Sequence, residues 1–250
     1  MNSKKNNEKS TATSTKEEEC IKEFIISDKF KKMMTNVLNS TKNVLTKRLE
    51  NLNNWTEADQ QEFLTIFGVP GDFKITSQYS SKGEKDFLSE TLDARTYMKE
   101  SISRLIFICE KISVQDRVCE NGLNVYGNFV NNTSITPGSA RVNDDRTIGL
   151  EPELYKNELK VEILQNFTKK KYSGSDSKVS TLCHELSHFC RYLINGEQRG
   201  GMGTKDSPTK TFDSNYNYVA YAKSLVDKHS PEVFNNAYNI EKYFEIKPDV

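Results

Sequence analysis

The residues with the clearest chemical potential in this chain are two histidines four positions apart, His184 and His188, with Glu185 directly after the first. On an α-helix, side chains four apart lie on one face, so both imidazoles can reach one metal ion at about 2.1 Å. The Glu185 carboxylate then reaches a metal-bound water but not the metal. Zinc lowers the pKa of that water, and the carboxylate takes its proton as the water attacks a carbonyl. The spacing predicts a hydrolytic site with one catalytic Zn²⁺ ion.

The surroundings of the motif indicate a buried helix. Leu182, Leu186 and Phe189 are apolar, and buried imidazoles need partners, for which a metal is suitable. The stretch SGSDSKVS, residues 173–180, offers several N-cap residues, so we expect a helix that continues through the motif to about Ile194. The alternative is a helix that carries two histidines on its polar side without a metal.

A zinc site of this kind needs a third protein ligand, and two common solutions are absent. Arg191 and Ile194 stand where the metzincin pattern requires glycine and histidine. Glutamates on later helices are available, but none stands in the Asn-Glu-x-x-x-Asp setting of the gluzincins; they are Glu232, Glu241 and Glu245. His229 lies between two predicted helices and is expected to be exposed.

An aspartate is the third solution, and here the sequence resembles a known family. The deuterolysin-like metalloendopeptidases, or aspzincins, carry His-Glu-x-x-His followed by Gly-Thr-x-Asp-x-x-Tyr-Gly. The stretch KTFDSNYN, residues 210–217, matches at Thr, Asp and Tyr and departs at both glycines. The stretch GTKD, which ends at Asp206, matches the first half, but Thr209 stands where Tyr is expected. We expect Asp213 to be the ligand rather than Asp206, because Tyr216 accompanies it.

The resemblance implies a role for each matching residue. His184, His188 and Asp213 would bind zinc. Glu185 would act as general base and then as proton donor to the leaving amine. Tyr216 would direct its hydroxyl toward the oxyanion that forms on the attacked carbonyl. The alternative for Tyr216 is a core tyrosine on a helix face.

The resemblance extends beyond the zinc motif, over about residues 41–245. Members of the family that are lysine-specific endopeptidases often end in a helix similar to NNAYNIEKYFE, residues 235–245. The stretch LTIFG, residues 64–68, partly matches a family element that follows an N-terminal helix. The resemblance implies an α+β, zincin-like metallopeptidase fold, mainly helical with a small antiparallel sheet beside the active-site helix. In the family, acidic residues near the zinc select lysine or arginine beside the scissile bond.

Periodicity and turn residues predict the elements that must position these side chains. Apolar residues at helical spacing, with capping and stop signals, predict five helices besides the one that carries the histidines; they cover about residues 16–53, 56–68, 92–112, 216–228 and 231–244. Short alternating runs among Gly and Asn predict a small antiparallel sheet over about residues 118–152. Within it, RTIGL (residues 146–150) is the candidate strand for pairing with a substrate backbone.

Composition and charge limit the organisation and the partners. We expect a disordered leader over 1–16, a helical section over 17–112 and a zincin-like catalytic section over 113–250 that is one continuous unit. The 35 basic and 35 acidic residues balance, which predicts no nucleic-acid partner, and no apolar run is long enough for a membrane span. The leader has no apolar core, so we expect no cleavable Sec signal and a location either in the cytoplasm or outside after specialised secretion.

The five cysteines are too few and too scattered for a disulfide framework. Cys109 and Cys119 could pair in an oxidising compartment. Cys183 and Cys190 are seven apart, about 10 Å along a helix, so they cannot bridge there and are expected to pack as small apolar residues.

The sequence thus predicts a zinc metalloendopeptidase that hydrolyses peptide bonds in proteins without a covalent intermediate. A role as a secreted effector or toxin, with a preference for basic residues, is compatible with it. The alternatives are a zinc amidohydrolase that acts on a non-protein amide and a catalytically inactive zinc-binding protein. Glu185 argues against the last, because a structural zinc site needs no free acid beside its ligands.

Overall fold

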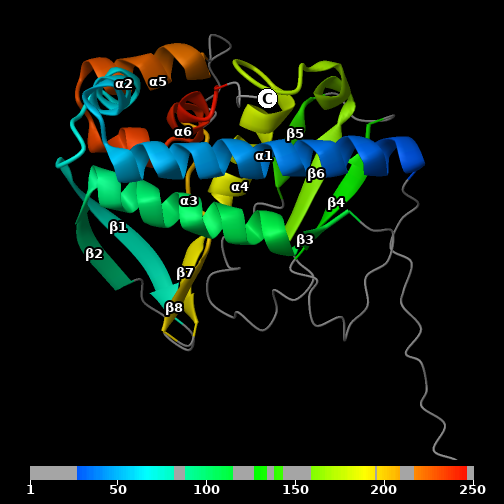
Figure 1. The fold of residues 1–250 in the computed structure, drawn as a ribbon, viewed down its shortest axis with the longest axis horizontal. Coiled ribbons are helices and arrows are strands. Elements are labelled where there is room, and N and C mark those ends of the chain that lie inside the picture. The colour runs from blue at the N-terminus through cyan, green and yellow to red at the C-terminus, as the bar shows by residue number, and fades with distance from the viewer. Residues whose placement is uncertain are drawn as a thin grey trace, which may run out of the picture.

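The computed structural model describes most of the chain as an α+β protein with helices in the majority (Figure 1). The described residues are 27–81, 88–114, 127–133, 138–142, 159–194, 196–208 and 217–246. The helices are α1 (Asp28–Asn54), α2 (Glu57–Phe67), α3 (Ala94–Lys111), α4 (Lys178–His188), α5 (Tyr218–Asp227) and α6 (Ala237–Tyr243), with short 3-10 helices at Gln165–Lys169 and Pro231–Phe234. The predicted α+β class is confirmed.

The strands form two small sheets, one on each side of the helix that carries the histidines. The strands are β1 (Lys74–Ser81), β2 (Leu88–Asp93), β3 (Ile112–Ser113), β4 (Gly127–Asn132), β5 (Ala140–Val142), β6 (Leu159–Leu164), β7 (Arg191–Ile194) and β8 (Glu197–Gly200). Their orders are β2-β1-β7-β8 and β3-β4-β6-β5. In the second sheet β3, β4 and β6 run parallel, and β5 pairs antiparallel with β6. The predicted sheet beside the active-site helix is therefore present, and its antiparallel strand is the edge strand β5.

Most helix predictions agree with the structure. The strongest local signals were at α2, where Thr56 and Asp59 form a capping box and Gly68 ends the helix with φ +72°. The prediction for α4 was wrong at its end. The helix stops at His188, because Arg191–Ile194 pairs with both β8 and β1 as strand β7. Residues 1–26 of the predicted leader and first helix lie outside the described residues.

Helix α1 packs against α3 and α4 and reaches the C-terminal helix (Figure 1). Its Arg48 is only 2% exposed. Arg48 donates through Nε to the Tyr243 carbonyl at 2.6 Å and through its two terminal nitrogens to Glu62. The last carbonyls of a helix have no partner within the helix, so the Arg48 guanidinium supplies one at the end of α6. The position of α6 is thereby tied to the core.

No helix in the described ranges combines the length and apolar character needed to cross a bilayer. Cys109 and Cys183 are buried and Cys190 is half-buried, which agrees with packing roles for Cys183 and Cys190. The predicted pairing of Cys109 with Cys119 lies outside the described residues, because Cys119 is not among them.

Candidate metal centre

Helix α4 begins at a capping box and carries the histidine motif through the middle of the protein. Ser177 is the N-cap; its hydroxyl accepts from the Ser180 N–H, and the Ser180 side chain accepts from the Ser177 N–H. His184 and Glu185 are 6% and 7% exposed, and His188 is half-buried. Two imidazoles and a carboxylate are thus held on a rigid, buried element, as the sequence predicts.

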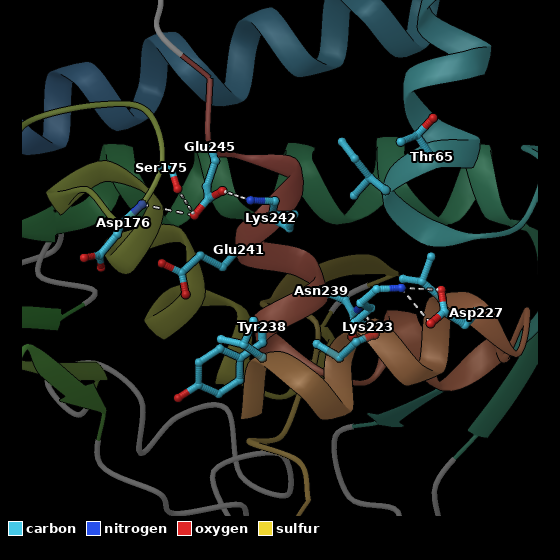
Figure 2. A pocket seen from close by; sticks show the side chains of 14 residues that line it. Thr65, Ser175, Asp176, Lys223, Asp227, Tyr238, Asn239, Glu241, Lys242 and Glu245 are labelled. Carbon is cyan, nitrogen blue, oxygen red and sulfur yellow. Dashed lines mark hydrogen bonds and ion pairs between the residues drawn. The ribbon is translucent and has the colours of Figure 1, made fainter. Parts of the chain in front are cut away.

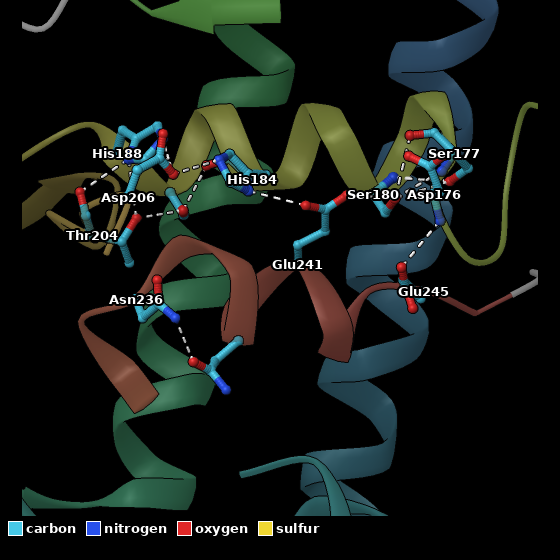
Figure 3. A network of polar contacts seen from close by, with 12 residues as sticks. Asp176, Ser177, Ser180, His184, His188, Thr204, Asp206, Asn236, Glu241 and Glu245 are labelled. Carbon is cyan, nitrogen blue, oxygen red and sulfur yellow. Dashed lines mark hydrogen bonds and ion pairs between the residues drawn. The ribbon is translucent and has the colours of Figure 1, made fainter. Parts of the chain in front are cut away.

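Each histidine is oriented through its Nδ1 atom by a different kind of partner (Figure 3). The Nδ1 of His188 lies 3.0 Å from the Thr204 carbonyl oxygen, and the Nδ1 of His184 lies 3.0 Å from Oε2 of Glu241. Because a carbonyl or carboxylate oxygen can only accept, both Nδ1 atoms carry the proton. Each Nε2 atom is therefore directed to the other side of the ring, where a metal can bind.

Asp206 lies on that side of both rings. Its Oδ1 is 3.0 Å from Nε2 of His184 and 3.6 Å from Nε2 of His188. The three ligand atoms lie within 4.8 Å of one another. Ligand atoms around a tetrahedral zinc ion lie about 3.4 Å apart, and two imidazoles with a carboxylate leave a fourth position open, as catalytic zinc sites do. The three side chains therefore fit a zinc ion in both separation and chemistry.

The segment before Asp206 is fastened to the end of α4. The last carbonyls of a helix lack intrahelical partners, and here the returning chain supplies them. Ser187 O accepts from the N–H groups of Met202 and Thr204, each at 3.1 Å, and Phe189 O accepts from the Gly203 N–H at 2.9 Å. The hydroxyls of Ser187 and Thr204 also share a hydrogen bond of 2.6 Å.

The residues around Asp206 are also held by the N-terminal end of α6. Lys205 donates its N–H to Asn235 O at 2.8 Å and accepts from the Ala237 N–H at 3.0 Å. The buried Asn236 side chain accepts from the Ser207 N–H at 3.4 Å. Asp206 is thus placed by backbone bonds on both of its neighbours.

The close return of the chain to α4 depends on a glycine. A Cβ atom built on Gly201 would lie 2.4 Å from Leu186 O and 2.6 Å from Phe189 O, distances that no real side chain tolerates. Both contacts are backbone atoms, one of α4 and one of its C-cap residue Phe189, so neither can move aside without shifting the end of α4 or the segment that leads to Asp206.

We therefore expect Gly201→Ala to lower zinc affinity in a protein that still folds. The clash costs about 1–3 kcal/mol and is relieved most easily by moving the segment that carries Asp206. Gly196→Ala is the matched control: Gly196 has φ +78° in the β7–β8 turn, with nothing within 4 Å of its added Cβ, so only backbone strain is introduced. Thermal unfolding and zinc titration of both variants measure the effect; equal zinc affinities in the two variants would contradict it.

From the sequence, Asp213 was expected to be the third ligand, whereas the structure brings Asp206 to the two histidines. Asp206, the second choice, meets the histidines. Asp213 and Tyr216, the first choice and its companion, lie outside the described residues, as does the candidate substrate strand, residues 146–150. The prediction for His229 is confirmed: it is exposed at the end of α5, where its Nδ1 bonds to a backbone carbonyl of the α2 terminus.

Glu185 lies between the metal side of α4 and the edge strand β5. Burial raises the pKa of Glu185 to about 7, opposed by the charge of His184 and by a hydrogen bond from the Val142 N–H, while the carboxylates of Asp206 and Glu241 raise it further. A carboxyl group with this pKa can exchange protons near neutral pH.

The centre as a whole attracts positive charge. Burial disfavours the charged form of His184, but hydrogen bonds to Asp206 and Glu241 outweigh burial and raise the pKa of His184 to about 10. Three carboxylates thus converge on two histidines; the third is that of Glu185. These carboxylates stabilise one positive charge at His184, which a proton on Nε2 supplies and which a cation bound at Nε2 would supply in its place.

Two tyrosines beside His184 were not singled out from the sequence. The Tyr238 ring meets the His184 ring edge to face at 4.9 Å, and Tyr218 stacks on Tyr238 at 4.6 Å. Burial, followed by the charge of Asp206, raises the pKa of Tyr238 above its ordinary value. The Tyr238 hydroxyl therefore remains protonated at neutral pH.

A cavity of ≈ 690 Å³ adjoins this side of the centre (Figure 2). Its walls come from α2, α5, α6 and the turn before α4, and apolar side chains make part of them: Ile66, Val219, Ala222 and Val226. Tyr238 and Glu241 line both the cavity and the surroundings of His184. The cavity therefore lies on the Nδ1 side of His184, and none of His184, His188 and Asp206 is among its lining residues.

No family model matches the sequence, and no curated protein matches it. Among solved structures, the chain is similar to a zinc peptidase from Grifola frondosa, with a TM-score of 0.47 and 17% identity over 88% of this chain and 96% of the other. A likeness of this size carries no conclusion about activity, so function has to be argued from the residues of the site.

Proposed function

We propose that this protein is a zinc-dependent metallopeptidase. The observation that carries the proposal is the convergence of His184, His188 and Asp206 from two segments, with Glu185 buried beside them. We take Asp206 as the third ligand, with Asp213 as the alternative. The donor set is one that zinc favours, and a free carboxylate next to the ligands is what distinguishes a hydrolytic site from a structural one.

In this proposal the residues of the chain divide the work of hydrolysis. A Zn²⁺ ion at the site supplies Lewis acidity toward a carbonyl and lowers the pKa of water. Glu185 takes the proton of the attacking water and returns it to the leaving amine, so no covalent enzyme intermediate is needed. Tyr216 remains the proposed hydroxyl donor to the oxyanion. Thr204 holds the His188 ring through its carbonyl.

The position of β5 supports a substrate with an extended backbone. Among the described residues, β5 is one of the two edge strands of its sheet, and its Val142 N–H reaches the Glu185 carboxylate. A peptide laid along such an edge would form main-chain hydrogen bonds and present its carbonyl near Glu185. We therefore propose a protein or peptide substrate, with β5 in place of the candidate strand at residues 146–150.

The cavity beside His184 supports a proposal on the residue next to the cleaved bond. Its lining holds four carboxylates, Asp176, Asp227, Glu241 and Glu245, against two lysines, Lys223 and Lys242. Each carboxylate already has a basic partner: Lys170 for Asp176, Lys223 for Asp227, His184 for Glu241 and Lys242 for Glu245. The proposed preference for a basic residue therefore requires that its ammonium group share one of these carboxylates, with its methylene groups against the apolar walls. The rival activities are hydrolysis of a non-protein amide and zinc binding without catalysis.

Metal removal tests the proposal directly. We expect the purified chain to bind one Zn²⁺ and to cleave an unfolded protein such as reduced casein. Dialysis against a chelator should abolish cleavage, and one equivalent of Zn²⁺ should restore it. Zinc binding with cleavage of small acyl amides only would favour the amidohydrolase, and zinc binding without any hydrolysis would favour the inactive binder.

A further inference from the structure

The two histidines of the centre are oriented by partners from different parts of the chain. His188 stands at the end of α4, and its Nδ1 bonds to the backbone carbonyl of Thr204, which adjoins the segment that carries Asp206. His184 stands one turn earlier, and its Nδ1 bonds to a side chain, Glu241, that is 57 residues away in the sequence. The orientation of His184 therefore depends on where α6 lies.

The Glu241 carboxylate is itself held at both oxygens. Oε2 accepts from His184, and Oε1 accepts from the Ser180 hydroxyl at 3.1 Å (Figure 3). Ser180 belongs to the capping box of α4, so the carboxylate lies beside the first turn of that helix. The positive end of the helix dipole stabilises a negative charge there. A carboxylate whose side chain is only 15% exposed is thus satisfied and has little freedom to turn.

Helix α6 is held at both ends, so its carboxylate cannot drift from His184. At its C-terminal end Arg48 donates to the Tyr243 carbonyl. At its N-terminal end the backbone of Asn235 and Ala237 bonds to Lys205, next to Asp206. One helix therefore controls the direction of one histidine and borders the segment that carries the aspartate.

We propose that Glu241 is a positioning residue of the metal centre, which holds the His184 ring with Nε2 toward the cation. This inference rests on the proposed function, because it assumes that the centre binds zinc. Glu241 does not touch the cation, since it bonds to the opposite ring nitrogen. Carboxylates in this position fix the tautomer and direction of a metal-binding histidine and typically contribute 10- to 100-fold in metal affinity.

Two substitutions at Glu241 separate orientation from packing. Glu241→Ala removes the acceptor, and we expect zinc affinity, measured by competition with a chromophoric chelator, to fall about 10- to 100-fold. Glu241→Gln keeps an oxygen for the His184 N–H, while its amide can donate to the Ser180 hydroxyl, so we expect it to retain most of the affinity. Cobalt(II) absorption spectra should change in the alanine variant and remain close to native in the glutamine variant.

Glu245→Ala is the matched control on the same stretch of chain. Glu245 accepts from Ser175 and from the Asp176 N–H and does not contact the histidines. Its loss should lower the unfolding temperature of the metal-free protein without changing zinc affinity. A fall in zinc affinity in Glu245→Ala as large as in Glu241→Ala would overturn the inference, because it would show displacement of the segment rather than loss of the histidine bond.

The outcomes distinguish the inference from the function on which it rests. A native chain that binds no zinc overturns both. A native chain that binds zinc and cleaves protein, with Glu241→Ala binding zinc equally tightly, overturns the inference alone. If Glu241→Gln loses as much zinc affinity as Glu241→Ala, a hydrogen bond from the His184 N–H to residue 241 is not what orients the ring, and the inference is overturned.

Discussion

Asp206→Ala is expected to lower zinc affinity by more than about 100-fold, because it removes a direct ligand. Substitution of a residue that only holds a ligand in place typically lowers metal affinity by roughly 10- to 100-fold. Oδ1 of Asp206 lies within 3.6 Å of the Nε2 atoms of both histidines, and no other carboxylate among the described residues joins that cluster. Cleavage should fall with zinc occupancy. The fold should survive in the metal-free protein, since the Asp206 side chain is 44% exposed and its neighbours hold the backbone.

Asp213→Ala is the control for this prediction and keeps the competing hypothesis open to test. Isothermal titration with Zn²⁺ on the native chain and both variants gives the affinities. We expect Asp213→Ala to bind zinc as the native chain does. Normal zinc binding by Asp206→Ala, together with a large loss in Asp213→Ala, would show that residue 213 completes the site and that Asp206 only borders it.

The ranking of the aspartates shows what a local pattern can and cannot establish. Tyr216 favoured Asp213, because a tyrosine three positions on matched the family pattern. The position of Asp206 depends instead on backbone bonds: loop N–H groups satisfy the free carbonyls at the end of α4, and Lys205 bonds to the start of α6. These are backbone bonds, which form with almost any side chains, so they leave almost no pattern in the sequence. The exception is position 201, where the close approach to α4 requires glycine.

The end of α4 was mispredicted for a related reason. Arg191 to Ile194 continues an apolar spacing that suits a helix, yet it forms β7 between β1 and β8. The Arg191 side chain is 1% exposed and bonds to Glu90 and Ser77, which lie on distant strands. Antiparallel pairing with β8 and partners more than 100 residues away in the sequence together decided the conformation of this segment, and a window along the chain cannot detect the distant partners.

The chemistry of the motif was predictable, whereas its supports were not. The spacing of His184 and His188 alone sets one face of a helix, so their approach and the place of Glu185 follow from local geometry. Glu241 was weighed from the sequence only as a direct ligand. Its bond to the far side of His184 depends on the packing of α6 against α4, a contact between segments 57 residues apart.

Glu185→Gln is expected to keep zinc and lose cleavage. Glutamine has the shape of glutamate and can still accept from the Val142 N–H, so the 7% exposed side chain should stay in place. It cannot take a proton from water, and the loss of a general base typically lowers the rate by about 10²–10⁴-fold. Zinc stoichiometry should remain that of the native chain, because the ligands are untouched.

A comparison with Asp206→Ala separates the role of a general base from that of a zinc ligand. Both variants should be inactive, but only Asp206→Ala should be empty of zinc, so activity and occupancy separate the base from the ligand. If Glu185→Gln cleaves protein within a few-fold of the native rate while zinc is bound, Glu185 is not the base, and another group must take the proton of the attacking water. If Glu185→Gln loses zinc as well, its carboxylate belongs to the ligand set, and the division between ligand and base inferred from the helix geometry fails.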